Sequence, residues 1–235
     1  MSAEDRLEAE RDRLRQVFRA RDAAGSERRY AGDRPAVRLE RRLLAAALDA
    51  IAPVPRGASV LEIGCGRGGL LPLLAARGAA TLSGVDLLEE RVAAARAALA
   101  PTELPLDLRV ACGSALPFPD ATFDLVALAT VTSGIRETTL RARIAGEARR
   151  VLAPGGRILH YDLVRRGPRS AAWSPVPIAA VEELFAMPVL AARTVGLVAP
   201  LARALGPLAT PLGPALARLP LLRSHALVVL GEARA

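Results

Sequence analysis

Apolar residues recur along this chain at two spacings, one typical of helices and one of buried strands. Helical spacing predicts a charged helix with a thin apolar stripe over residues 4–22 and a better-buried helix over residues 37–51. Further on, apolar runs predict strands at 59–63, 81–85, 106–111, 123–129 and 157–161, with helices at 70–77, after Asp86 up to Leu99, and at 137–152. This alternation predicts an α/β fold with a doubly wound, largely parallel sheet.

Beyond residue 162 the pattern is looser. It predicts a helix over 178–185 and strands over 189–197 and 226–230. Between these strands lies an apolar stretch that prolines and arginines interrupt too often for a membrane span. We therefore expect a helical lid at 1–52 and a main domain at 53–235, with residues 198–222 as an apolar insertion. That insertion either caps a substrate or packs against the sheet edge.

The composition of the 235 residues narrows the chemistry. Hydrophobic residues make up 51% of the chain, enough for one domain with a substantial core. All 32 basic residues are arginine, and the sequence also lacks asparagine. Without lysine, neither a Schiff base nor the lysine of a P-loop can form, so imine catalysis and Walker-type nucleotide hydrolysis are excluded.

Charge and cysteine content bear on partners and compartment. Residues 60–162 hold 11 arginines and 11 acidic residues, so the formal charge of +8 arises in the flanks. Basic flanks either meet an anionic partner or are ordinary solvated surface. Few aromatic residues accompany these arginines, so we expect no nucleic-acid partner. Cys65 and Cys112 suggest no disulfide framework, and the charged N-terminus lacks an apolar signal region, so we expect a cytoplasmic protein.

A glycine turn follows the first predicted strand, in the sequence Leu-Glu-Ile-Gly-Cys-Gly-Arg-Gly-Gly of residues 61–69. Glycines let the backbone approach a ligand closely, and Asp86, at the end of the next strand, can accept hydrogen bonds from both hydroxyls of a ribose. A nucleoside-containing ligand is therefore predicted. The spacing of Gly64, Gly66 and Gly69 also fits a dinucleotide fingerprint, which alone is weak evidence. Glu62 argues against it, because a carboxylate there suits an ammonium group better than a pyrophosphate.

Two further motifs, at residues 113–118 and 150–156, also argue against a nicotinamide-dependent dehydrogenase. With them, the sequence resembles the class I S-adenosylmethionine-dependent methyltransferases of the small-molecule, type 11 kind, over about residues 30–162. The resemblance implies a Rossmann-like seven-stranded sheet with an antiparallel last strand, and a transferase that uses S-adenosyl-L-methionine. It also implies the cofactor contacts. Glu62, Gly64, Cys65 and Gly66 would hold the methionine part, Asp86 the ribose, Leu87, Ser114 and Ala115 the adenine, and Thr130 with Val131 the sulfonium side.

The acceptor is less defined. We expect the methyl acceptor to be an oxygen or nitrogen atom of a small molecule with an apolar portion, such as a natural-product, lipid-like or glycosylated intermediate. Arg165, Arg166 and Arg169 could bind a carboxylate or phosphate of that molecule. No metal is expected. If the last strand lies beside the fifth, Asp162 and His225 could form a general base, or both could be polar caps of strands. The alternatives are a non-catalytic scaffold of this fold and a nicotinamide-dependent oxidoreductase.

Overall fold

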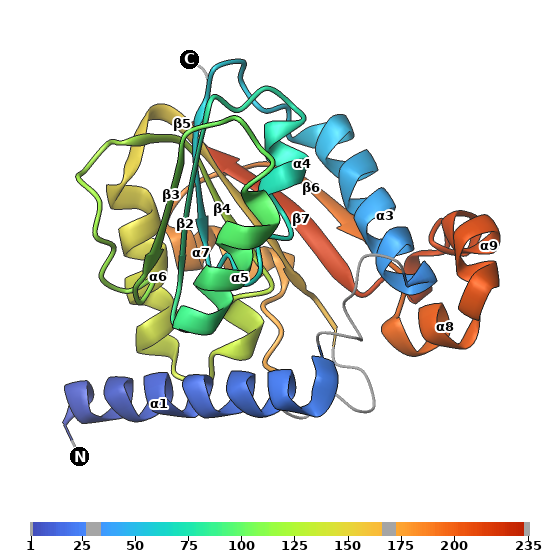
Figure 1. Cartoon of the computed structure of the whole chain (residues 1–235), viewed down its shortest axis with the longest axis horizontal. Coiled ribbons are helices and arrows are strands. Elements are labelled where there is room, and N and C mark those ends of the chain that lie inside the picture. Colours follow the sequence, from blue (N-terminus) through green and yellow to red (C-terminus); the bar gives the residue numbers. More distant parts are fainter. Residues whose placement is uncertain (1, 27–33, 166–172, 233–235) are drawn as a thin grey trace.

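The computed structural model describes residues 2–26, 34–165 and 173–232 (Figure 1). Its centre is a seven-stranded sheet in the order β3-β2-β1-β4-β5-β7-β6. The strands are β1 (Ser59–Ile63), β2 (Thr81–Asp86), β3 (Leu106–Val110), β4 (Phe123–Ala129), β5 (Leu152–Leu163), β6 (Val189–Val195) and β7 (His225–Gly231). Strands β1 to β5 pair in parallel, and β7 runs antiparallel to both β5 and β6. The predicted sheet, with its antiparallel last strand, is confirmed.

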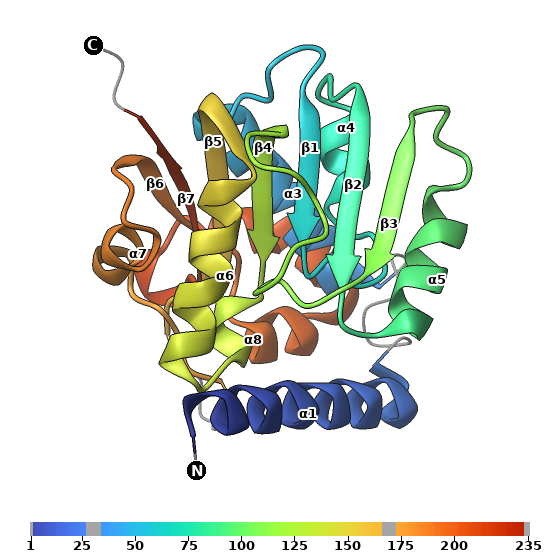
Figure 2. The ribbon, with the colours of Figure 1, turned by 90° about the vertical axis from the view of Figure 1, so that its left-hand side faces the viewer.

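Helices cover both faces of this sheet. The described α-helices are α1 (Ala3–Arg21), α3 (Pro35–Ile51), α4 (Leu71–Ala75), α5 (Glu89–Leu99), α6 (Thr138–Arg150), α7 (Ile178–Phe185), α8 (Ala199–Ala204) and α9 (Ala209–Leu216). One apolar cluster joins α3, α4 and α5 to the sheet, and a second joins α6 and α7 to its other face. The two clusters make this a three-layer α/β domain (Figures 1 and 2).

Helix α1 lies across the carboxyl ends of the parallel strands, outside both helical layers (Figure 2). Its start is fixed by a capping box, in which the Ser2 hydroxyl accepts from the Asp5 N–H and the Asp5 carboxylate accepts from the Ser2 N–H. The thin apolar stripe predicted from the sequence is buried at Leu7 and Leu14, which join the cluster of α6 and α7. Ligands of open α/β sheets bind at this edge, so α1 covers the expected site.

Element boundaries differ from the predictions in a few places. Strands β1 and β4 and helix α7 have the predicted bounds, whereas α4 ends two residues early, at Ala75. Strand β5 begins at Leu152, because Leu152 pairs with Phe123 ahead of a register shift. The region of residues 198–222 contains α8, α9 and two 3-10 turns, η3 (Gly206–Leu208) and η4 (Pro220–Leu222). In the part of the chain that the structure describes, no helix has the length and apolarity needed to cross a membrane.

Candidate functional site

Strands β1, β2 and β3 follow one another toward one edge of the sheet, whereas β4 and β5 lie on the other side of β1. The order of the strands therefore reverses between β1 and β4, and the glycine turn lies at the carboxyl end of β1. The N–H groups of Gly64 and Cys65 both donate to the Val85 carbonyl, at 2.8 and 2.9 Å, which fastens the turn to β2. Gly64 has a φ of +73°, and a Cβ at this position would lie 2.6 Å from Cγ2 of Val131. The turn therefore needs glycine at residue 64 both for its backbone conformation and for its contact with the loop after β4.

Asp86 lies at the end of β2, opposite the glycine turn. Its carboxylate accepts the N–H of Gly66 at 3.0 Å through one oxygen and the N–H of Leu88 at 3.0 Å through the other. Burial raises the pKa of Asp86, although these two donors and the charge of Arg91 act in the opposite direction. The carboxylate is thus held in one orientation beside the turn, as a ribose site requires.

Glu62 is the most buried carboxyl of the site, with an exposed fraction of 2%. Its Oε2 atom has no hydrogen-bond partner. Burial and the nearby charge of Asp86 raise the pKa of Glu62 well above its ordinary value, and the Leu71 N–H opposes them. A buried acceptor without a donor is costly, and a cationic ammonium group at the turn would satisfy it.

The loop after β3 carries Ser114 and Ala115, predicted for the adenine end. The Ser114 hydroxyl lies 3.1 Å from Sγ of Cys112 and accepts a hydrogen bond of 3.2 Å from Arg11 of α1. Ala115 is exposed, and Leu87, after β2, is half-buried beside the cluster of α6 and α7. The contact between Arg11 and Ser114 was not predicted, because a charged helix surface gives no sign in the sequence of the loop it will meet.

Thr130 follows β4 at the predicted methionine end. It has a φ of +56°, uncommon for a residue with a branched Cβ, and its N–H donates to the Tyr161 carbonyl at 2.7 Å. Its hydroxyl donates to the carbonyl of Ala129 at 2.7 Å. These bonds hold an unfavourable backbone conformation that turns Val131 toward Gly64, and such conformations concentrate at functional sites.

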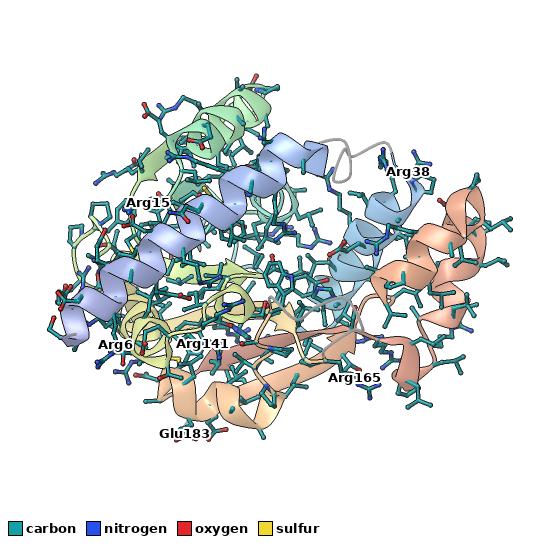
Figure 3. All side chains as sticks on the ribbon, turned by 90° about the horizontal axis from the view of Figure 1, so that it is seen from below. Arg6, Arg15, Arg38, Arg141, Arg165 and Glu183 are labelled. Atoms are coloured by element: carbon teal, nitrogen blue, oxygen red, sulfur yellow. The ribbon has the colours of Figure 1, made fainter. Side chains whose placement is uncertain are left out.

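Helix α1 is fastened to this edge by polar contacts at both ends and in the middle. The Glu10 carboxylate, 8% exposed, accepts from the Arg136 N–H at 2.6 Å and pairs with Arg13, whose guanidinium also donates to the Gly134 carbonyl at 2.7 Å. Toward the end of α1, Arg19 pairs with Glu90 at 3.0 Å. Viewed from below, α1 runs diagonally over the strand ends (Figure 3). These contacts hold α1 against the carboxyl ends of the strands.

The predicted pair of Asp162 and His225 does not form. Their strands are neighbours, but Asp162 lies opposite Ala226, and side chains alternate between the faces of a strand. The Asp162 carboxylate points to the side of α6 and α7, where it accepts from the Thr132 hydroxyl at 2.8 Å and the Ser133 N–H at 2.9 Å. Asp162 thus fixes the turn after β4, η2 (Thr132–Gly134), and does not orient His225.

His225 belongs to a different cluster, on the side of α3. Its ring stacks on Tyr161 with 5.0 Å between centroids, and its Nδ1 lies 2.8 Å from the Ser224 hydroxyl. The Tyr161 hydroxyl donates to Glu40 of α3 at 3.5 Å. Burial lowers the pKa of His225, against the opposing charges of Glu40 and Asp162, so the ring is neutral near pH 7.

Sequence reasoning missed Glu40, whereas it placed Tyr161 near His225 through the strand pairing but gave it no role. A signal for Glu40 existed, because it stands on the apolar face of its helix, between Leu39 and Leu43, where a carboxylate needs a partner. Arg165 is exposed beside η4, and Arg166 and Arg169 lie outside the described residues. Within the described ranges, no group of three or more His, Cys, Asp and Glu side chains is placed to hold a metal ion.

Comparison with known proteins agrees with this geometry. A family model described as a methyltransferase domain matches residues 60–156. The chain is 37% identical over 118 residues to a ubiquinone/menaquinone biosynthesis C-methyltransferase of Bordetella avium, covering 48% of this chain and 44% of that protein. It is 36% identical over 133 residues to a phosphatidylethanolamine N-methyltransferase of Cereibacter sphaeroides, covering 56% and 60%. The chain thus spans about half the length of these two curated relatives.

Among solved structures, a geranyl diphosphate C-methyltransferase from Streptomyces coelicolor, in complex with S-adenosyl-L-homocysteine, superposes with a TM-score of 0.63. It is 15% identical, and the match covers 82% of this chain and 78% of that one, which shows a shared fold. The fold and its switch point thus define a Rossmann-like nucleoside-binding domain. Together with the family match, they show that the chain carries a class I methyltransferase domain whose cofactor is S-adenosylmethionine. The resemblance of its motifs is confirmed.

Proposed function

We propose that this chain transfers the methyl group of S-adenosylmethionine to an oxygen or nitrogen atom of a small molecule with an apolar portion. The observation that carries the proposal is the unpartnered, buried Oε2 of Glu62 at the switch point. No other residue of the glycine turn offers a negative charge to the ammonium group of the cofactor. A dinucleotide with its pyrophosphate at the turn would leave this carboxylate opposed by like charge.

We assign to these residues the cofactor roles that the family resemblance implies, and their positions support the assignment. Glu62 holds the ammonium group, and the backbone of Gly64, Cys65 and Gly66 lies along the methionine part. Asp86 accepts from the ribose hydroxyls, because its carboxylate is oriented by two N–H donors beside the turn. Leu87 packs on the adenine, whose edge meets Ser114 and Ala115, and Thr130 lies on the sulfonium side.

When bound, the cofactor supplies a methyl group that its cationic sulfur has already activated. The remaining work of the protein is to align the acceptor and exclude water. Helix α1 covers the carboxyl ends of the strands, so it serves as the lid of the 1–52 segment over the 53–235 domain (Figure 2). The lid must open for exchange of cofactor and product.

A proton must leave a hydroxyl or protonated amine acceptor, and His225 is the group placed to accept it. The neutral ring is held by Tyr161 on one face and by the Ser224 hydroxyl at Nδ1, which leaves Nε2 for the acceptor. Glu40 stands behind Tyr161 and stabilises the charged ring that results. Asp162 is a positioning residue, because its contacts hold η2 beside Thr130.

An apolar acceptor is supported from two sides. The two curated relatives are named for lipid acceptors, a quinone and a phospholipid. In this chain the 198–222 insertion packs on α3 around Leu39, the neighbour of Glu40, so apolar side chains border the cluster of His225. We therefore assign the inner side of the insertion to the wall of the acceptor site.

Calorimetric titration with S-adenosylmethionine and S-adenosylhomocysteine tests the proposal. We expect binding with a Kd of about 1–100 μM, weakened at least about tenfold by Asp86→Ala and by Glu62→Gln. Glu183→Gln, on the outer surface of α7, is the matched control and should bind normally (Figure 3). Binding of NADPH in place of both sulfur compounds would overturn the proposal. Binding of the cofactor without turnover on any lipid, quinone or phenolic acceptor would favour the alternative of a non-catalytic scaffold.

A further inference from the structure

The outer surface of the 198–222 insertion is unusually apolar. Six large apolar side chains of the described residues are exposed, and four of them lie within this short stretch. They are Leu208, Leu212, Leu219 and Leu221, with exposed fractions of 55%, 47%, 54% and 78%. Large apolar side chains exposed so close together in the sequence are uncommon on a monomer and point to a surface that a partner covers.

Helix α9 explains why these leucines cannot turn inward. Its inner side is already packed, since Ala209 and Gly213 are buried and a Cβ on Gly213 would overlap the side chain of Leu39 in α3. Leu208 and Leu212, four residues apart and each one position before a packed residue, lie about 100° around the helix from that side and are exposed. A short helix that is apolar on its packed side and on its solvent side needs an apolar environment outside the molecule.

Charge shows which environment fits. There is no acidic residue between Glu183 and Glu232, whereas Arg203 and Arg218 are exposed on the insertion itself. Arg165 donates to the Leu221 carbonyl at 3.2 Å and lies at the edge of the same surface (Figure 3). A stretch that exposes leucines and arginines and contains no carboxylate complements a surface that is apolar inside and anionic at its boundary.

We propose that the insertion docks on an anionic membrane surface, with Leu208, Leu212, Leu219 and Leu221 below the headgroups and Arg203 and Arg218 among the phosphates. The lobe of α8 and α9 projects beyond α3, clear of the sheet, so it can reach such a surface (Figure 1). A second copy fits less well, because a symmetric contact would bring the arginines of both copies together. The proposal does not depend on the acceptor or on methyl transfer.

Co-sedimentation of the full chain with vesicles tests the docking. We expect binding to phosphatidylcholine vesicles that contain about 30 mol% phosphatidylglycerol, weakened by salt, and at least about tenfold weaker binding to phosphatidylcholine alone. Leu212→Glu and Leu221→Glu should each lower the affinity about tenfold. Val110→Glu is the matched control, because Val110 is 53% exposed on the opposite edge strand and receives the same charge.

Replacing Arg203 and Arg218 by glutamine should remove most of the preference for anionic vesicles while binding through the leucines persists. The melting temperature of each variant checks that the fold is retained. Absence of vesicle binding by the parent chain would overturn the proposal, and so would equal losses for Val110→Glu and Leu212→Glu. A dimer that Leu212→Glu dissociates, without vesicle binding, would assign the surface to a second copy.

Discussion

Arg11 and Ser114, 103 residues apart in the sequence, are joined by a hydrogen bond of 3.2 Å between the guanidinium and the hydroxyl. The bond links the lid helix to the loop proposed for the adenine edge. Nε of Arg11 is buried without a partner, so the guanidinium is held there by contacts at its far end. We therefore expect any movement of α1 to change access to the adenine end, in part through this side chain.

Arg11→Ala should loosen the lid. We expect dissociation of S-adenosylhomocysteine to become about 5–10 times faster, because the loss of one or two charge-assisted contacts corresponds to about 1 kcal/mol. Stopped-flow displacement measures the rate. Arg15→Ala is the control, since Arg15 pairs with Glu8 and Asp12 of its own helix. Equal rates for the two variants would show that Arg11 does not hold the lid.

Glu62→Gln should have opposite effects on folding and on cofactor binding. The folded-state pKa of Glu62 is raised, so the folded protein holds this proton more tightly and loses stability as pH rises above the ordinary carboxyl pKa of 4.5. The variant removes that loss and should be more stable near pH 7, on the order of 1 kcal/mol, with weaker cofactor binding. Thermal unfolding of the variant and the parent chain at a series of pH values from about 4 upward measures the first effect. A variant less stable than the parent chain at pH 7 would contradict the claim that burial raises the pKa of Glu62.

Cofactor affinity should itself depend on pH through Glu62. An ammonium group favours the carboxylate, so a proton held by Glu62 in the free protein must leave when the cofactor binds. Affinity for S-adenosylhomocysteine should therefore rise with pH above 4.5, and calorimetry in buffers of different ionisation enthalpy should detect the released proton. In Glu62→Gln this proton release should vanish, whereas proton release that persists would place it on another group.

His225→Ala should lower turnover about 100-fold with cofactor affinity unchanged. Because the pKa of His225 is lowered from 6.5, the acid limb of the pH–rate profile should fall below pH 6.5. Glu40→Gln should move that limb further down, since the charge of Glu40 raises the His225 pKa. Asp162→Asn should move the limb in the same direction but by less, since the smaller effect of the Asp162 charge also raises the His225 pKa, and it should lower the melting temperature as well. A profile unchanged in His225→Ala would exclude this ring as the base.

Two glycines of the turn should respond differently to alanine. A Cβ at Gly64 would meet Val131 at 2.6 Å, so Gly64→Ala should destabilise the fold by about 2–4 kcal/mol. A Cβ at Gly66 would meet nothing within 4 Å, so Gly66→Ala should cost only about 1 kcal/mol of backbone strain. It should nevertheless weaken S-adenosylhomocysteine binding about 100-fold, because the methyl group enters the space proposed for the cofactor. Equal binding by Gly66→Ala and the parent chain would show that the cofactor does not occupy that space.

The sheet could be predicted from the sequence because each buried strand carries its own apolar run, and the strand of residues 123–129 was placed from that run alone. The nearness of Glu62, Gly66 and Asp86 could also be predicted, because β1 and β2 are neighbours whose carboxyl ends meet, and the role of the three residues toward a cofactor stays a prediction. The contacts of Asp162 and His225 could not be predicted in this way. Their strands were correctly paired, but which face each side chain takes depends on the register between β5 and β7, and spacing along the chain does not encode it.

The position of β7 between β5 and β6 has a consequence for synthesis on the ribosome. Strand β6 pairs with β7, so residues 189–195 have no neighbour in the sheet until residues 225–231 emerge. The edge of β5 that pairs with β7 also stays unpaired until the same seven residues emerge. Once residues 189–195 have been made, the nascent chain therefore carries the open edges of β5 and β6 together, and it is most vulnerable to aggregation in this interval, before β7 closes both.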